Sequence, residues 1–229
     1  YLTDRTTVEK AEKMKVGTCL NPLHTALAVY GCLLGYTSIA AEMGDADLKA
    51  LVEHIAAESL PVVEDPGILS PRAFIDEVLH ERFPNPAIPD TPQRIAADTS
   101  QKLPVRYGGT LRRYARQSEQ ALAGLEFAPL VFAGWCRYLL GVDDRGNAMP
   151  VSPDPMLPQL QAHLKGIEVG RPDSLAGQLR PILSNAALFG VDLYAAGLGE
   201  RTEEMFRDML AGPGAVRATL HRNCACKQP

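Results

Sequence analysis

The chain has 229 residues, a formal net charge of -4 and 46% hydrophobic residues, with a mean hydropathy of -0.08. This length suits one large domain with a sizeable core, and we predict a single domain over residues 1–229. The mild acidic balance provides no general attraction to nucleic acid or to anionic membranes, so we expect neither as a partner.

No apolar run approaches the roughly 18 residues of a membrane span without a polar or helix-breaking interruption. The five cysteines are odd in number, and three of them lie in apolar stretches, which favours core thiols in a reducing compartment. We therefore expect a cytoplasmic protein. Cys224 and Cys226 with His221 provide too few ligands for a zinc site, and we predict no metal.

The first chemically informative stretch runs from Lys15 to His24 and leads into an apolar segment. Asn21 followed by Pro22 is typical of a helix start, because asparagine caps free N–H groups and proline fits the first turn. His24 would then lie near the positive end of the helix dipole, which favours a neutral imidazole. The same pattern would arise if Asn21 only capped the helix, His24 were a hydrogen-bonded core histidine and Lys15 were solvated. Spacing alone therefore does not decide between a reaction site and this structural interpretation.

Helix starts recur along the rest of the chain, whereas strand signals are few. We predict a first long helix over residues 22–42, a segment capped by Asp45, and helices near residues 71–83 and 92–102 that open at Ser70-Pro71 and Thr91-Pro92. The apolar run at residues 130–139 follows helical rather than alternating spacing, and with Trp135 it is expected to be a core stripe. Further helices are predicted after Asp173, at Thr202 and at Gly212-Pro213. The pattern predicts an all-α fold. No strand precedes a G-x-G-x-x-G motif, so a dinucleotide-binding unit is not expected within the chain.

Cationic side chains form two groups on the predicted helices. Arg94 and Lys102 are eight residues apart, so on one helix they would share a face and could bind a carboxylate or several hydroxyls. The alternative is a solvated helix face. A second group, Arg112, Arg113 and Arg116, is expected to be solvated or to contact another domain.

Two blocks together resemble the mannitol dehydrogenase family, the long-chain polyol and hexuronate dehydrogenases. The first block contains Lys15, the Asn21-x-x-His24 motif and the glycine-containing apolar helix that follows. The second, residues 90–104, resembles that family's second signature, and the similarity continues through Trp135 to the turn before Gly146. Five residues separate Lys15 from Asn21, where the family usually has four.

The resemblance implies the C-terminal, substrate-binding half of a two-domain dehydrogenase, with residues 1–14 as a remnant of the junction to an N-terminal Rossmann domain. That domain would bind most of the cofactor, NAD, with NADP left open. Lys15 would exchange the proton, Asn21 would stabilise the alkoxide and His24 would orient the substrate. Arg94 and Lys102 would bind the substrate.

The implied reaction interconverts a hexonate or polyol and its keto form. Residues 19–27 resemble the hexonate branch of the family, which favours D-mannonate and D-fructuronate. Polyol oxidation of the mannitol 2-dehydrogenase type, a β-hydroxyacid dehydrogenase and a non-catalytic helical interaction module are the alternatives. Absence of a pocket joining the five predicted site residues would favour the last of these.

Overall fold

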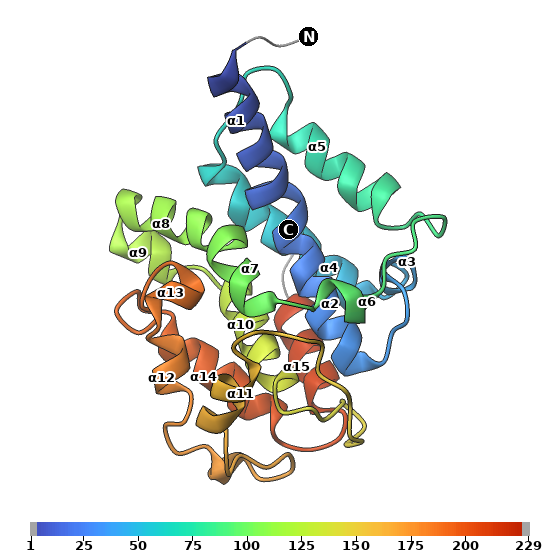
Figure 1. Ribbon diagram of the computed structural model, residues 1–229, viewed down its shortest axis with the longest axis vertical. Coiled ribbons are helices and arrows are strands. Elements are labelled where there is room, and N and C mark those ends of the chain that lie inside the picture. Colours follow the sequence, from blue (N-terminus) through green and yellow to red (C-terminus); the bar gives the residue numbers. More distant parts are fainter. Residues whose placement is uncertain (1–3, 226–229) are drawn as a thin grey trace.

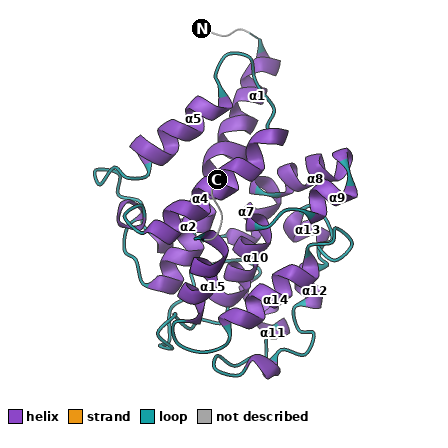
Figure 2. Cartoon of the chain, turned by 180° about the vertical axis from the view of Figure 1, so that it is seen from behind, coloured by secondary structure: helices purple, strands orange, loops and turns teal. Residues whose placement is uncertain are grey.

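The computed structural model describes residues 4–225, and the fold is all-α, as the sequence predicted (Figures 1 and 2). In that part of the chain no β-strand forms, and only two isolated bridges occur, Val142–Ala148 and Glu168–Arg171. The α-helices are α1 (Arg5–Met14), α2 (Asn21–Leu34), α3 (Ile39–Glu42), α4 (Ala46–Ser59), α5 (Pro71–Glu77), α6 (Pro92–Ile95), α7 (Thr99–Arg106), α8 (Gly108–Gln117), α9 (Glu119–Ala123), α10 (Phe127–Tyr138), α11 (Leu157–His163), α12 (Arg180–Leu183), α13 (Ala186–Phe189), α14 (Gly199–Met209) and α15 (Ala215–Cys224). Two π-helical segments, η1 (Lys15–Leu20) and η3 (Val78–Arg82), and two 3-10 segments, η2 (Leu60–Val62) and η4 (Pro172–Ser174), complete the secondary structure.

Two apolar helices, α2 and α10, form the centre of the core. Every residue of α10 is buried, and so is almost all of α2, because both sequences are apolar on all sides. They pack against each other and against α4, with α14 lying along α10. The Tyr30 hydroxyl in α2 donates to the Leu130 carbonyl in α10 at 2.9 Å, which gives this buried phenol a partner. Trp135 is fully buried here, as expected.

The helix α1 projects from one end of the molecule beside α5 (Figures 1 and 2). It continues without a break into η1 and α2, so the chain is helical from Arg5 to Leu34. The part of the chain predicted to be a junction remnant, residues 1–14, is therefore mostly helix in the described range.

Several predicted boundaries were wrong. The first long helix ends at Leu34, because Gly35 adopts a left-handed conformation (φ 81°), and α3 begins only at Ile39. The helix predicted after Asp173 is only the short 3-10 segment η4. The helix predicted at Thr202 begins at Gly199, and the last helix begins at Ala215, after Gly214 in a left-handed conformation.

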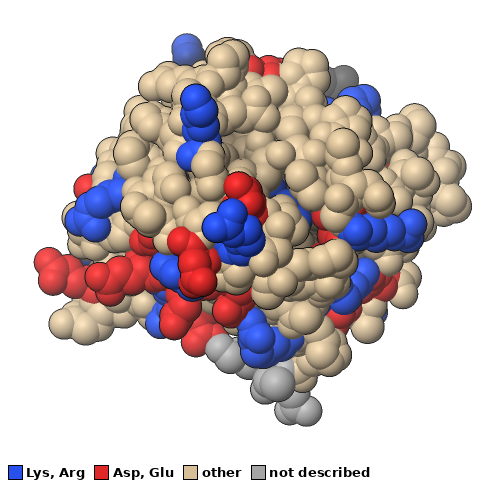
Figure 3. Space-filling view, turned by 90° about the horizontal axis from the view of Figure 1, so that it is seen from below, with Lys and Arg blue, Asp and Glu red and all other residues tan. Residues whose placement is uncertain are grey.

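No helix among residues 4–225 combines the length and the apolar content needed to cross a bilayer. The charged side chains on the face seen in Figure 3 include both acidic and basic groups, interspersed rather than gathered into one basic patch. Cys19, Cys32 and Cys136 are buried free thiols, as predicted for core cysteines. Cys224, expected in a polar terminal segment, is also a buried free thiol at the end of α15, while Cys226 lies outside the described residues.

Candidate active site

Asn21 is the first residue of α2 but does not cap a new helix, because η1 runs directly into α2; this corrects the predicted helix start. Its backbone is already helical (φ -72°, ψ -31°), and it follows η1 directly, with no side-chain cap at this junction. The Asn21 carbonyl accepts from the Thr25 hydroxyl at 2.9 Å, but its side-chain amide has no hydrogen-bond partner among residues 4–225. The amide is therefore available for a ligand and does not cap the helix.

The π-helical segment η1 accounts for the longer spacing between Lys15 and Asn21. An α-helix holds 3.6 residues per turn, and a π-turn holds about one residue more because its hydrogen bonds run from i to i+5. One additional residue can thus be absorbed in a π-turn with little change in the direction of the following side chains. Five intervening residues in η1 correspond in angle to about four in a regular α-helix.

His24 is buried, and its ring is electrically neutral at pH 7. Burial lowers its pKa to about 4; the Asp90 carboxylate opposes this shift, and the guanidinium groups of Arg106, Arg82 and Arg94 add to it. The neutral state was predicted, but from the dipole of a helix start at Asn21. Helical structure already runs from Arg5 through η1 into α2, so burial and nearby cations are the cause instead.

The ring nitrogen Nε2 of His24 lies 3.4 Å from Oδ2 of Asp90, yet it forms no hydrogen bond within the described part of the chain. Because the imidazole is neutral, this contact is not an ion pair at pH 7. A buried nitrogen without a partner is rare in folded proteins and indicates a group reserved for a ligand or for water. The Phe83 ring, 5.2 Å from the imidazole, lines its other side.

Arg94 is paired with Asp90. Its Nη2 donates to Oδ1 of Asp90 four residues earlier, and the Arg94 side chain is 62% exposed. The same carboxylate thus touches both Arg94 and His24. The charge of Arg94 is partly offset by this aspartate before any substrate arrives.

The second correction concerns Lys102, which does not share a helix with Arg94. The predicted helix over residues 92–102 breaks at Asp98, which adopts a left-handed backbone (φ 54°), unusual for a residue other than glycine. The Asp98 N–H donates to the Pro153 carbonyl at 2.8 Å, and Asp154 caps the start of α7 through Ser100. These contacts with residues 153 and 154 hold the break in place.

After the break, α7 turns Lys102 back over the end of α6. Its ammonium donates to the carbonyls of Ile95, at 3.1 Å, and of Ala97. Burial lowers the pKa of Lys102, and the nearby guanidinium of Arg106 acts in the same direction. Lys102 therefore lies beside the second predicted block but is already hydrogen-bonded to the backbone.

Sequence analysis missed Arg106, one helical turn after Lys102. Its Nη1 donates to the Thr25 hydroxyl at 2.6 Å, which ties the end of α7 to the helical turn of α2 that carries Asn21 and His24. The four-residue spacing from Lys102 was the available signal. The structure thus gathers His24, Arg94, Lys102 and Arg106 from three helices.

Lys15 is not joined to this group by any described contact. Its Nζ lies 5.2 Å from the centre of the Phe74 ring in α5, a cation–π distance. The side chain is half-buried, at the start of η1. Its predicted place beside Asn21 and His24 remains a prediction.

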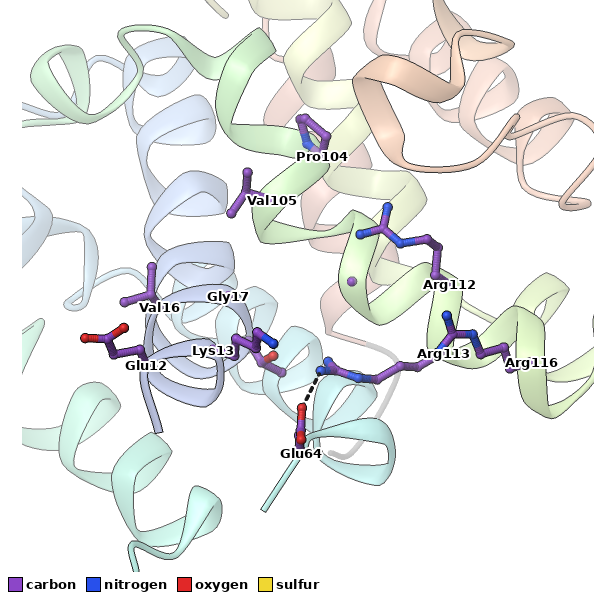
Figure 4. A pocket seen from close by; sticks show the side chains of 12 residues that line it. Glu12, Lys13, Val16, Gly17, Glu64, Pro104, Val105, Arg112, Arg113 and Arg116 are labelled. Atoms are coloured by element: carbon purple, nitrogen blue, oxygen red, sulfur yellow. Dashed lines mark ion pairs between the residues drawn. The ribbon is translucent and has the colours of Figure 1, made fainter. Parts of the chain in front are cut away.

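A cavity of about 670 Å³ lies between the η1 side of the molecule and the helices α7 and α8 (Figure 4). It contains none of the five predicted site residues, so it is not the pocket joining them whose absence was expected to favour a non-catalytic module. Figure 4 shows Arg112, Arg113 and Arg116 along one wall, with Arg113 paired to Glu64 at 3.5 Å. Val16 and Val105, which also line it, are 47% and 63% exposed.

Metal ligands are not grouped in this site. No set of three or more His, Cys, Asp or Glu side chains within residues 4–225 is arranged to hold an ion. Of the three possible zinc ligands near the C-terminus, His221, Cys224 and Cys226, the last lies outside that range.

Comparison with known proteins identifies the class of this domain. The chain belongs to the mannitol dehydrogenase family, because residues 7–204 match the mannitol dehydrogenase C-terminal domain. The solved structure of Pseudomonas fluorescens mannitol 2-dehydrogenase, a ternary complex with NAD and D-mannitol, has the same fold. Its TM-score is 0.80 at 27% identity, over 100% of this chain and 42% of that chain.

Two sequence relatives narrow the comparison within the family. The D-mannonate oxidoreductase of Thermotoga maritima is 57% identical over 96% of this chain, which covers 41% of that protein. The mannitol 2-dehydrogenase of Emericella nidulans is 36% identical over 83% of this chain, covering 35% of that protein. The chain therefore spans about two fifths of the length of these relatives.

Proposed function

We propose that this chain is the substrate-binding domain of an NAD-dependent oxidoreductase that interconverts D-mannonate and D-fructuronate. The observation that carries the proposal is the buried, neutral His24, whose Nε2 has no hydrogen-bond partner within residues 4–225 and which lies one helical turn from the free Asn21 amide. The 57% identity to a D-mannonate oxidoreductase supports this substrate over a polyol.

The cofactor would be held mainly by another part of the full-length protein. No parallel strand pair forms within residues 4–225, so this part of the chain does not build the strand–loop–helix site that binds dinucleotide phosphates. We propose an N-terminal Rossmann domain as that part. When bound, the nicotinamide supplies the hydride acceptor for oxidation and the hydride donor for reduction.

The residues of this chain would provide the proton transfer and the hydrogen bonds. In oxidation, Lys15 takes the proton of the reacting hydroxyl and returns it in reduction. The Asn21 amide donates to the oxygen as negative charge develops on it. His24 hydrogen-bonds a neighbouring hydroxyl through Nε2, while Arg94 and Lys102 border the substrate.

We further infer that the other domain covers the cavity shown in Figure 4. Val16 and Val105 are exposed apolar side chains at its edge, and arginines of α8 form its wall. Exposed valines flanked by charged groups are typical of a surface that another domain covers. A cytoplasmic location also fits, because the four described cysteines are free thiols.

The test is NADH oxidation by the natural protein that contains this chain, with D-fructuronate and D-fructose as substrates. We expect turnover of D-fructuronate, and a loss of about 100-fold or more in Lys15→Ala, the range of general acid–base catalysis. Lys165→Ala, at an exposed lysine far along the chain, is the matched control and should keep full activity. Turnover of D-fructose alone would assign the polyol reaction, and an unchanged Lys15→Ala would remove the lysine from its role.

A further inference from the structure

Two arginines near His24, Arg82 and Arg106, have no acidic partner among residues 4–225, and of these Arg82 is exposed whereas Arg106 is partly buried. The side chain of Arg106 is partly buried, and within residues 4–225 it forms no ion pair with a carboxylate. Its one described hydrogen bond is the 2.6 Å contact from Nη1 to the Thr25 hydroxyl. A guanidinium has five N–H donors, so four remain for other acceptors.

The other two cations of the group are already occupied. Arg94 is bound to Asp90, and its side chain is mostly exposed to solvent. Lys102 donates to the two backbone carbonyls at the end of α6. Neither therefore offers an uncompensated charge in an enclosed place.

A charge that is enclosed without a counter-ion is costly to a folded protein, because it has lost water and gained no opposite charge. Burial accordingly lowers the pKa of Arg106, although the group stays protonated at any physiological pH. A planar guanidinium matches a carboxylate, which it can bind through two parallel hydrogen bonds. A bound carboxylate would remove this cost.

The link through Thr25 sets the position of that charge relative to the proposed reacting groups. The Thr25 hydroxyl accepts from Arg106 and donates to the Asn21 carbonyl, and Thr25 directly follows His24. Arg106 is thus tied to the same helical turn that carries Asn21 and His24. A single small substrate could therefore place its anionic group on the free N–H groups of Arg106 and its other groups beside Asn21 and His24.

We propose that Arg106 binds the carboxylate of the substrate and thereby selects sugar acids over neutral polyols. This inference rests on the function proposed above. It moves the acid-recognising role from Arg94, which the sequence favoured, to a residue that the sequence analysis did not single out.

The experiment measures KM of the natural protein for D-fructuronate and for D-fructose in five forms: wild type, Arg106→Gln, Thr25→Val, Arg94→Gln and a control variant. Arg106→Gln should raise KM for D-fructuronate about 10- to 100-fold, the usual effect of losing a charged hydrogen bond, and should leave KM for D-fructose within about 3-fold. Thr25→Val keeps the guanidinium but removes its tie to α2, so it should raise KM for D-fructuronate less than Arg106→Gln does. Arg207→Gln, at an exposed arginine of α14, is the matched control and should keep both KM values.

A second readout separates recognition from structure. Calorimetric titration of wild type and Arg106→Gln with D-mannonate and with D-mannitol should show the loss of affinity for the acid alone. If Arg106→Gln and Thr25→Val both lost the same affinity for D-mannonate as for D-mannitol, the proposal would be overturned. Arg106 would then only hold α7 against α2. A selective loss in Arg94→Gln instead would also overturn it. If wild type converts no hexuronate, the proposed function itself fails. This outcome differs from equal affinity losses and from a selective loss in Arg94→Gln, in both of which wild type still converts D-fructuronate.

Discussion

The carboxyl of Glu42 provides a sharp test of how burial shapes this domain. Glu42 is fully buried at the end of α3, and neither of its side-chain oxygens has a hydrogen-bond partner among residues 4–225. It fits against Gly31 of α2 and the ring of Pro92. Burial, with a smaller contribution from Asp45, raises its pKa from 4.5 to about 9.

This shift predicts a pH-dependent cost that Glu42→Gln should remove. In the unfolded chain the carboxyl ionises above pH 4.5, whereas in the folded chain it holds its proton up to about pH 9. Folding therefore takes up a proton between these values, and stability falls as the pH rises through that window. At pH 7 the difference of 2.5 pH units corresponds to about 3 kcal/mol.

The measurement is urea unfolding of this chain and of Glu42→Gln between pH 4.5 and 8.5. Trp135 is the single tryptophan and is fully buried, so its fluorescence reports unfolding directly. We expect Glu42→Gln to gain up to about 3 kcal/mol at pH 7, or roughly 6 to 12 °C in Tm for a chain of this size. The gain should shrink to about 0.4 kcal/mol at pH 4.5, where half of the carboxyls are also neutral in the unfolded state.

Glu77→Gln, at an exposed glutamate of α5, serves as the control and should change stability little at any pH. A gain in Glu42→Gln that is the same at pH 4.5 and pH 8.5 would refute the reasoning, since ionisation would then play no part. A loss of stability at pH 7 would do so too, because it would mean that the carboxylate is paired in the folded chain.

Three further outcomes follow from buried polar groups. Because the pKa of His24 is lowered to about 4, the imidazole takes up a proton on unfolding between pH 6.5 and 4. Wild type should therefore lose up to about 3 kcal/mol relative to His24→Gln as the pH falls through that range, and a constant difference in urea unfolding would contradict this. Glu58 accepts from three backbone N–H groups at the start of α10, so Glu58→Ala should cost about 2 kcal/mol by the same assay; no loss would show that water replaces the cap. Arg137 donates to the carbonyls of Met209, Val142 and Asp143, and Arg137→Met should lower the free energy of unfolding by about 3 kcal/mol; a thermal scan showing an unchanged Tm would argue against it.

Elements that depend on local chemistry were predicted correctly. Asp45, Ser70 and Thr91 each cap the helix that follows, because a side-chain oxygen and the N–H groups it accepts from are only two or three residues apart. The apolar pattern of residues 130–139 likewise indicated a buried helix. These signals lie within one or two helical turns.

Features that depend on distant residues were missed. The break at Asp98 is held by the carbonyl of Pro153 and by Asp154, more than 50 positions away, and so it could not be predicted from residues 92–102. The π-helical turn before Asn21 replaced the expected helix start. Residue types near the site were recognised, but which charges are already paired follows only from the fold.

Arg106 could not be identified as a site residue from the sequence. Its spacing from Lys102 is an ordinary helical repeat, and its contact with Thr25 joins positions 81 residues apart. Only the fold shows that this arginine has no acidic neighbour among residues 4–225, whereas Arg94 has one.

Gly31 constrains which sequences this fold can accept over evolutionary time. A methyl group at position 31 would overlap the carboxyl of Glu42 and the ring of Pro92, so the two positions cannot enlarge independently. Among related sequences, alanine or serine at position 31 should therefore occur together with a shorter side chain at position 42. We therefore expect positions 31 and 42 to change together, with glycine kept at position 31 wherever position 42 carries a long side chain.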